Sequence, residues 1–302
     1  MMARTVGSGG KRRRGLAGKG PTPKAEDRVW HKAYRDNKTP RQTSKSQRAT
    51  SVGRGAGADW VVGRNPVLEA LHARLPIKAI YVVQGSERDN RLRDIFTYAA
   101  DHSISLLQTT RLELDRLTGG AVHQGIALQL PSYDYAHADD LIADALHSDQ
   151  PGLLIALDQI TDPHNLGAIA RSAAAFGAHG LIIPERRSAS VSAVAWKSSA
   201  GALARIRVGR TVNLNRTISD AAKAGFTVVG LAAEGQTDIS AIPGVDGPVM
   251  IVVGSEGNGL SRLTRERCDL LATIPISSDV ESLNASVAAA IACYEISRCR
   301  PQ

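Results

Sequence analysis

The sequence predicts an α/β protein with two folded domains and a disordered, basic N-terminal tail. From residue 151 onward, apolar segments of strand length alternate with helical patterns, which is typical of a parallel sheet covered on both faces. A shorter alternating series occupies residues 59–131, and the first 58 residues contain few apolar side chains. The length of 302 residues exceeds one average domain and agrees with this division.

The tail, residues 1–58, buries too little apolar surface to offset its chain entropy, so we expect disorder in isolation. It holds 15 of the 37 Lys and Arg residues and three of the 29 Asp and Glu, which leaves 22 basic and 26 acidic side chains elsewhere. A detached cationic segment favours contact with RNA or DNA, and Trp30 and Tyr34 add rings that stack on unpaired bases. A solvated tail without a partner is the alternative.

In the first domain, residues 59–131, order should begin at Trp60, with Asn65 as a helix N-cap and Pro66 as the first helical residue. The pattern then predicts, in chain order, helix 67–74, strand 78–85, helix 89–102, strand 103–109, helix 111–119 and strand 123–130. Residues 132–150 are expected to form a connector with one short helix.

The second domain, residues 151–302, alternates more regularly. We expect strands at 153–158, 180–184, 204–209, 226–232, 248–254 and 271–276, and helices at 165–177, 190–199, 215–225, 260–268 and 282–298. Ligands of such folds gather at the carboxyl ends of the strands, so the loops there are the first place to look for a site.

The first polar segment, residues 162–172, follows a predicted strand and opens a helix. Asn165 is a candidate helix cap, and Gly167 leaves room for close backbone approach. Arg171 lies nearly two turns further on, and the residues three and four positions away from it are uncharged. An arginine without a carboxylate on its own helix face favours a functional role over a structural ion pair.

The second polar segment, residues 254–261, follows an apolar strand. Gly254, Gly257 and Gly259 lack the Gly-x-Gly-x-x-Gly spacing of a dinucleotide site, which argues against a nicotinamide cofactor. The glycines permit the backbone to fold around a flat ligand, and Glu256 places a carboxylate at that edge. A tight turn without a ligand is the alternative.

The third polar segment runs from Ile274 to the start of the last predicted helix. Unpaired N–H groups at that helix N-terminus, together with Ser282 and Asn284 beside the apolar Leu283, combine a polar rim with an apolar wall. This combination suits adenine and a thioether. Ser282 as a plain N-cap is the alternative.

These segments read Asn-x-Gly-Ala-x-x-Arg-Ser at 165–172, Gly-x-Glu-x-x-Gly at 254–259, and Ile-Pro at 274–275 followed by Ser-Leu-Asn-x-Ser at 282–286. In this order they resemble the signatures of the SPOUT superfamily, in particular the TrmH-like RNA ribose 2′-O-methyltransferases. Residues 63–71 and 119–125 resemble the L30e-like substrate-binding domain of the branch that acts on a guanosine of 23S ribosomal RNA. Ser278 in place of a usual Gly, and Ala285 in place of a common Val, depart from the pattern near the adenosine.

The resemblance implies a deep trefoil knot at the C-terminus, which is an exception to the rule that chains avoid threading loops. It also implies that S-adenosylmethionine is held there through backbone groups at Leu231, Gly254, Ile274 and Leu283. A homodimer with its active site across the two-fold interface is a further implication.

The resemblance also implies catalytic roles. Arg171 is the family's candidate for assisting loss of the ribose 2′-OH proton. Because an arginine normally stays protonated, we interpret its role as stabilising the developing alkoxide or a nearby phosphate. Asn165 and Glu256 would orient the reacting groups, with Ser282 and Asn284 supporting the pocket.

Other features narrow the setting. No apolar run is long enough to span a bilayer and no secretory signal is recognisable, so we expect a cytoplasmic protein without a membrane partner. Cys268, Cys293 and Cys299 are too few and too poorly spaced for a disulfide framework or a zinc site, so we expect reduced thiols and no metal. His123 and His164 are isolated and favour structural roles.

Alternatives remain open within and beyond this class. A tRNA ribose methyltransferase, or a resistance-conferring enzyme for another ribosomal nucleotide, fits the same motifs. A non-catalytic RNA-binding ribosome-assembly factor is a distant alternative, against which the intact Asn165, Arg171, Glu256 and Asn284 argue. A nicotinamide-dependent oxidoreductase is more distant still.

Overall fold

The computed structural model describes residues 54–55, 58–86, 89–277 and 282–300. Nearly all of the expected tail lies outside these residues, so its disorder and its contact with nucleic acid stay predictions. Strand β1 (Arg54–Gly55) pairs antiparallel with β2 (Ala58–Val62), so the sheet begins before Trp60, earlier than expected.

The N-terminal domain contains a mixed sheet of five strands in the order β1-β2-β5-β3-β4. Its other strands are β3 (Ala79–Val83), β4 (Leu106–Thr109) and β5 (Ile126–Gln129). β5 runs antiparallel to β2 and β3, while β4 runs parallel to β3. Helices α2 (Arg64–His72), α3 (Asn90–Asp101) and α4 (Arg111–Leu117) follow β2, β3 and β4, so all three begin at the same edge of the sheet.

The expected cap of α2 is wrong. The helix starts at Arg64, its N-cap is Gly63 with φ 100°, and no side chain of the helix start caps it. The reason lies in tertiary structure, because the Gln124 Oε1 atom accepts the Arg64 N–H at 3.3 Å and takes the place of a local cap. Asn65 and Pro66 therefore lie inside the first turn.

The C-terminal domain confirms the expected parallel sheet, whose eight strands run in the order β11-β13-β10-β12-β7-β8-β9-β6. The strands are β6 (Ala136–His137), β7 (Leu153–Leu157), β8 (Gly180–Pro184), β9 (Arg207–Thr211), β10 (Thr227–Leu231), β11 (Thr237–Asp238), β12 (Val249–Val253) and β13 (Leu270–Thr273). The helices are α5 (Ala138–Leu146), α6 (Pro163–Ala175), α7 (Ala193–Ser198), α8 (Leu214–Lys223), α9 (Arg262–Arg265) and α10 (Ala285–Arg298), with short 3₁₀ turns at Ala202–Ala204 and Ile239–Ala241.

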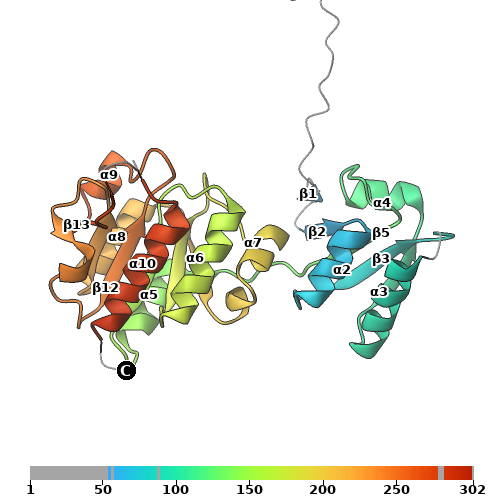
Figure 1. Ribbon diagram of the computed structural model, residues 1–302, viewed down its shortest axis with the longest axis horizontal. Helices are drawn as coiled ribbons and strands as arrows, with labels where there is room; N and C mark the ends of the chain where they lie inside the picture. The colour runs from blue at the N-terminus through green and yellow to red at the C-terminus, as the bar shows by residue number, and fades with distance from the viewer. Residues whose placement is uncertain (1–53, 56–57, 87–88, 278–281, 301–302) are drawn as a thin grey trace, which may run out of the picture. The chain divides into compact units, whose positions relative to one another are not determined.

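Helices cover both faces of this sheet. One face packs against α6, α7 and α10, and α6 lies beside α10 (Figure 1). The other face packs against α5 and α8. β7 and β12 are fully buried between these layers, as their continuous apolar sequences indicate.

The connector expected at 132–150 belongs to the C-terminal sheet. Ala136 and His137 form its outermost strand and pair with β9, and α5 buries Leu141 and Ile142 in the core on that face. The sequence did not reveal this because a two-residue edge strand has no periodicity to read. No helix among the described residues is long and apolar enough to cross a membrane.

Candidate active site

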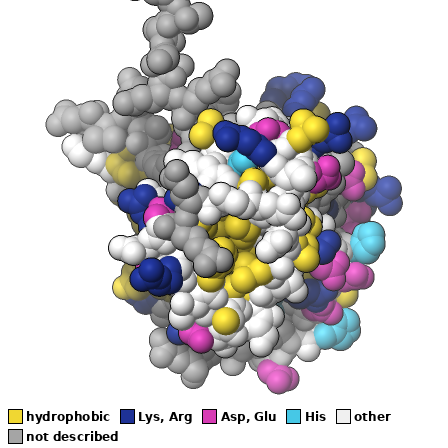
Figure 2. Space-filling model, turned by 90° about the vertical axis from the view of Figure 1, so that its right-hand side faces the viewer, with side chains coloured by type: hydrophobic (Ala, Val, Ile, Leu, Met, Phe, Trp, Pro, Cys, Tyr) yellow, Lys and Arg dark blue, Asp and Glu magenta, His cyan; other side chains and the backbone are white. Residues whose placement is uncertain are grey.

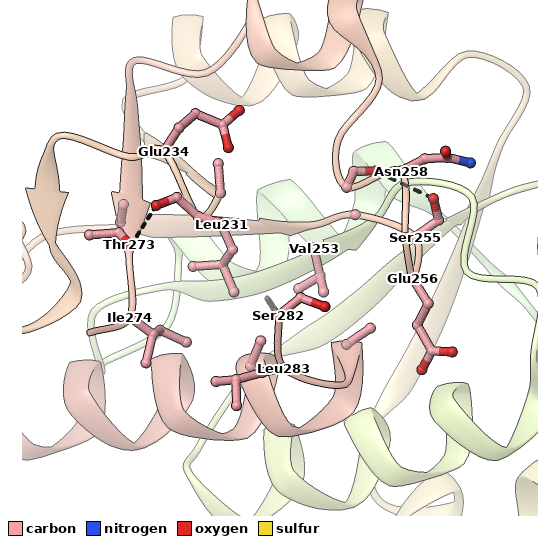
Figure 3. Close-up of a pocket in the computed structure, with 18 of the residues that line it drawn as sticks. Leu231, Glu234, Val253, Ser255, Glu256, Asn258, Thr273, Ile274, Ser282 and Leu283 are labelled. Atoms are coloured by element: carbon pink, nitrogen blue, oxygen red, sulfur yellow. Dashed lines mark hydrogen bonds between the residues drawn. The ribbon is translucent and has the colours of Figure 1, made fainter. Parts of the chain in front are cut away.

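A pocket of about 300 Å³ lies at the carboxyl ends of β10, β12 and β13. Leu231, Gly254, Ile274 and Leu283, the four residues expected to hold the methyl donor, all line it. Figure 3 shows Leu231, Ile274 and Leu283 gathering around it from separate segments of the chain. Neighbouring parallel strands thus bring distant loops to one edge of the sheet.

The loop after β12 forms one wall. Ser255 and Gly259 exchange backbone hydrogen bonds of 3.0 and 2.9 Å, and Gly257 and Gly259 adopt φ of 80° and 62°. A Cβ at Gly254 would lie 2.2 Å from the carbonyl carbon of Gly259, so this residue must be glycine for the loop to close. The tight turn named as the alternative is therefore present, and it builds the wall of the pocket.

The first polar segment differs from expectation in two ways. Asp162 caps α6 by accepting the His164 N–H at 2.8 Å, so Asn165 is not the cap. Asn165 lies in the first turn, 7% exposed, and faces Glu256. Gly167 makes room for α7, since a Cβ there would lie 2.3 Å from the Ala195 carbonyl oxygen.

The third segment also differs. The cap of α10 is Asn284, whose Oδ1 atom accepts the N–H groups of Ser286 and Val287 at 2.9 and 3.4 Å. Ser282 lies before the helix, exposed, and lines the pocket (Figure 3). The expected departure at Ser278 lies outside the described residues.

The three segments meet in a small hydrogen-bond network. The Asn165 Nδ2 atom donates to Glu256 Oε1 at 2.8 Å, and the Asn284 Nδ2 atom donates to Asn165 Oδ1 at 3.2 Å and to the same Glu256 oxygen. Because the Oδ1 atom of Asn284 is engaged by helix N–H groups, its amide nitrogen must face Asn165, which fixes the direction of the remaining bonds. We name these three residues the amide–carboxylate network.

Arg171 lies apart from this network. It is exposed on α6, does not line the pocket, and forms no hydrogen bond or ion pair within the described part of the chain. Its guanidinium group is therefore available to a molecule that the structure does not contain.

Two family models match the chain. Residues 152–294 match the SpoU rRNA Methylase family, and residues 60–136 match RNA 2'-O ribose methyltransferase substrate binding. An "Uncharacterized tRNA/rRNA methyltransferase" from Mycobacterium sp. (strain KMS) is 53% identical over 296 residues, covering 98% of this chain and 93% of the relative. Another with the same name, from Mycobacterium avium (strain 104), is 54% identical over 297 residues, with the same coverage.

The chain belongs to the SpoU methyltransferase family.

Solved structures agree with this assignment. The SpoU methyltransferase AviRb from Streptomyces viridochromogenes, in complex with the cofactor AdoMet, has 25% identity and a TM-score of 0.56, covering 80% of this chain and 90% of that one. A putative RNA methyltransferase of the TrmH family from Porphyromonas gingivalis has 26% identity and a TM-score of 0.54, with the same coverage. The chain described here is accordingly an S-adenosylmethionine-dependent RNA methyltransferase.

The pocket of this SpoU methyltransferase fits that cofactor. Leu231, Ile274 and Leu283 supply apolar surface for an adenine ring and a thioether chain. Glu234 and Glu256 lie at opposite sides of the pocket (Figure 3). Glu234 pairs with Arg265, so Glu256 is the carboxylate that can face a cationic sulfonium or ammonium. No group of His, Cys, Asp and Glu arranged to hold a metal ion occurs among the described residues.

Sequence reasoning missed an ion pair and an anchor at this site. Arg265 on α9 pairs with Glu234 in the loop after β10, and both line the pocket. Asp158, directly after β7 and 5% exposed, accepts the Ser261 N–H at 2.8 Å and anchors the loop that begins at Gly254. A carboxylate at the end of an apolar strand was a signal that pointed to Asp158, whereas no local pattern linked Glu234 to Arg265.

Proposed function

We propose that this enzyme transfers the methyl group of S-adenosylmethionine to a ribose 2′-hydroxyl of RNA, with a guanosine of 23S ribosomal RNA as the substrate. The observation that supports the site is the convergence of Asn165, Glu256 and Asn284 beside the pocket that is lined by the expected donor-binding residues. The matches to a SpoU rRNA Methylase model and to a ribose methyltransferase substrate-binding model support the ribose and the ribosomal RNA.

The bound donor supplies a methyl group that its sulfonium already activates for in-line displacement. The protein therefore has to position the 2′-hydroxyl and favour loss of its proton. Arg171 stabilises the developing alkoxide or an adjacent phosphate as a fixed cation. The amide–carboxylate network holds the carboxylate of Glu256 at the rim of the pocket, where it orients the reacting groups, and Ser282 completes the rim.

We also propose that the enzyme is a homodimer in which Arg171 serves the partner's pocket. Arg171 is exposed and lies outside the pocket of its own subunit. On α10, which packs beside α6, Val287 and Tyr294 are 46% and 47% exposed, and the Tyr294 ring contacts Phe176 at the end of α6. Exposed apolar side chains on α10, and an arginine on α6 that has no ionic partner in the described part of the chain, support a two-fold interface through these two helices.

Methyl transfer tests the reaction directly. Labelled methyl groups are transferred to unmodified large-subunit RNA and to tRNA, and the labelled nucleotide and ribose position are mapped. We expect Arg171→Ala to lower turnover on the ribosomal RNA by about 10²- to 10³-fold. Binding of S-adenosylhomocysteine should stay unchanged, and so should turnover of the control variant Arg216→Ala, whose exposed arginine lies on the opposite face of the sheet. Methyl label found only on tRNA would show that tRNA, and not ribosomal RNA, is the substrate. Turnover of Arg171→Ala equal to that of the parent enzyme would refute the role of Arg171.

Subunit complementation tests the dimer. Arg171→Ala and Leu283→Asp subunits are each expected to be inactive, the first without the cation and the second without an intact pocket. Mixed after unfolding and refolding together, they should regain about a quarter of the parent activity, because half of the dimers are mixed and each mixed dimer has one complete site. If Arg171 acts within its own subunit, the mixture stays inactive.

The chain path supports the proposed trefoil knot. β13 pairs between β10 and β11, and a Cβ at Gly235 would lie 2.6 Å from the Ala272 carbonyl carbon, so the loop after β10 crosses β13 closely. To test the knot, cysteines at the two ends of the chain are joined covalently and the closed chain is denatured. Its radius of gyration from small-angle scattering should then be smaller than that of an unknotted closed chain of the same length. Equal dimensions would exclude the knot. The cytoplasm stays our expectation for where the enzyme works.

A further inference from the structure

The N-terminal domain has two adjacent pockets that the methyl-transfer site does not use. The first, of about 460 Å³, is lined by Arg64, Arg111, His123 and Gln124, and we call it the cationic pocket. The second, of about 270 Å³, is lined by Leu92, Phe96, Leu106, Leu107 and Gln108, and we call it the apolar pocket. Residues 83–86, at the end of β3, line both, so the two pockets share a wall.

Topology explains why these residues meet. β2, β3 and β4 run in the same direction, and the helices that follow them begin at one edge of the sheet. Arg64 starts α2, Arg111 starts α4, and the loop before β5 brings His123 and Gln124 to the same edge. Two stretches that lie far apart in the sequence, 63–71 and 119–125, thereby both contribute residues to one pocket.

The cationic pocket holds one fixed and one available guanidinium group. Arg64 is held by Asp89 Oδ2 at 2.9 Å and by the Gln124 carbonyl oxygen at 3.2 Å, and its side chain is only 18% exposed. Arg111 is exposed and makes no ion pair or hydrogen bond with the residues that the structure describes. No carboxylate lines this pocket among those residues, and although Asp89 offsets the charge of Arg64, the positive charge of Arg111 favours an anion.

The His123 side chain fixes the loop that faces these arginines. Its Nδ1 atom accepts the Gly125 N–H at 3.0 Å, and its Nε2 atom donates to Asp115 at 3.0 Å. Gln124 adopts a left-handed φ of 51°, and its Oε1 atom accepts the Arg64 N–H. The two hydrogens on the Gln124 amide nitrogen have no acceptor among the described residues and can therefore face a ligand.

The apolar pocket opens at the edge strand of the sheet. Leu106 and Leu107 on β4 are 41% and 42% exposed, and neighbouring side chains on a strand point to opposite faces. Exposed leucines on an edge strand are a liability unless they serve a partner. Figure 2 shows hydrophobic side chains near the middle of one face of the molecule, with both basic and acidic side chains around them.

We propose that these two pockets bind one unpaired nucleotide of the RNA substrate, with its phosphate at Arg64 and Arg111 and its base in the apolar pocket. An apolar pocket that shares a wall with a pocket lined by two guanidinium groups matches an extruded base attached to a phosphate, and a paired base is not accessible to such a pocket. Gln84, Gln108 and Gln124 supply amide groups for the base edge. The inference rests on the proposed function only in taking RNA as the substrate.

Binding of short RNA to the full-length protein tests this inference. The probe is a fluorescent oligouridylate of about 12 nucleotides, measured by anisotropy across a salt series, beside an abasic strand of equal length. Arg111→Gln should weaken binding of both strands about fivefold to tenfold and reduce the slope of log K against log salt by about 0.7, the value for one phosphate of a single strand. Lys78→Gln is the matched control, since this exposed lysine precedes β3 at the opposite edge of the sheet.

Leu106→Ser distinguishes the contribution of the base to binding from that of the phosphate. It should weaken binding of the oligouridylate about tenfold, leave its salt slope unchanged, and leave the abasic strand unaffected. Equal effects of Arg111→Gln and Lys78→Gln, or equal effects of Leu106→Ser on the two strands, would overturn the inference. Each variant should bind S-adenosylhomocysteine like the parent, which excludes misfolding. If the parent methylates no RNA but shows these binding differences, the proposed function fails and the pocket assignment stands.

Discussion

Replacing Asn165 by alanine removes the central member of the amide–carboxylate network. Asn165 is the only one of the three that is buried, and it links Glu256 in the loop after β12 to Asn284 at the start of α10. The substitution leaves the apolar packing of α6 in place, because the side chain of Asn165 faces the network and not the sheet core. It therefore isolates the contribution of these hydrogen bonds.

The expected cost follows from the two bonds lost. The bond of 2.8 Å to the Glu256 carboxylate is charge-assisted and of a kind worth about 1.5–3 kcal/mol, and the bond of 3.2 Å from Asn284 is of a kind worth about 1 kcal/mol. Because Glu256 and Asn284 are exposed, water replaces part of what they lose, and we expect a net cost of about 2 kcal/mol. For a folded unit of this size, that lowers Tm by about 4–8 °C.

The assay combines stability with donor binding. Thermal unfolding gives Tm, and calorimetric titration with S-adenosylhomocysteine gives the affinity of the pocket that Glu256 lines. The control is Asn213→Ala, which removes the cap of α8 on the opposite face of the sheet, where Asn213 Oδ1 accepts the Arg216 N–H at 3.1 Å. That cap is worth about 1 kcal/mol, and its loss should leave donor affinity unchanged.

Two results would refute the reasoning. A fall in Tm for Asn165→Ala no larger than that for Asn213→Ala would show that the network contributes nothing beyond an ordinary cap. Unchanged affinity for S-adenosylhomocysteine and unchanged methyl transfer would show that the position of Glu256 does not depend on Asn165.

Three further outcomes are expected. Gly254→Ala should abolish binding of S-adenosylhomocysteine, since the added Cβ overlaps the backbone of its own loop; calorimetric binding like that of the parent would show that the loop adapts. Burial raises the pKa of the Cys293 thiol to about 12, so iodoacetamide at pH 8 should label the exposed Cys299 and spare Cys293 in the native protein, as peptide mass spectrometry reports. Burial and the nearby Arg300 lower the pKa of His179, whose Nδ1 atom accepts a backbone N–H. The neutral ring therefore stabilises the fold at high pH, and this stabilisation is lost as the pH falls below the pKa of the unfolded state, near 6.5. His179→Gln should flatten the dependence of Tm on pH between 7 and 5, and an unchanged slope would contradict this.

The order of the strands and helices could be predicted because each has a local signal. The continuous apolar sequence of β12, for example, requires burial on both faces whatever the rest of the chain does. The three polar segments, in their order, resemble family signatures that imply a methyl-donor site, and Leu231, Gly254, Ile274 and Leu283 line one pocket. Each strand and each polar segment is identified from side chains close together in sequence.

The roles of individual polar residues could not be predicted in the same way. Asn165 and Ser282 satisfy every local requirement of a helix cap, yet Asp162 and Asn284 are the caps. A cap is decided by where the backbone turns into the helix, and that point is set by packing of the whole helix against the sheet.

The sequence by itself determined a parallel α/β sheet, a cationic first segment and three polar segments at strand ends, because periodicity and composition are local properties. Only the tertiary structure decided that Glu256 binds both Asn165 and Asn284, that Arg265 pairs with Glu234, and that Arg171 does not line the pocket. Hydrogen bonds and ion pairs act over a few ångströms, and only folding brings residues that are far apart in the chain within that distance.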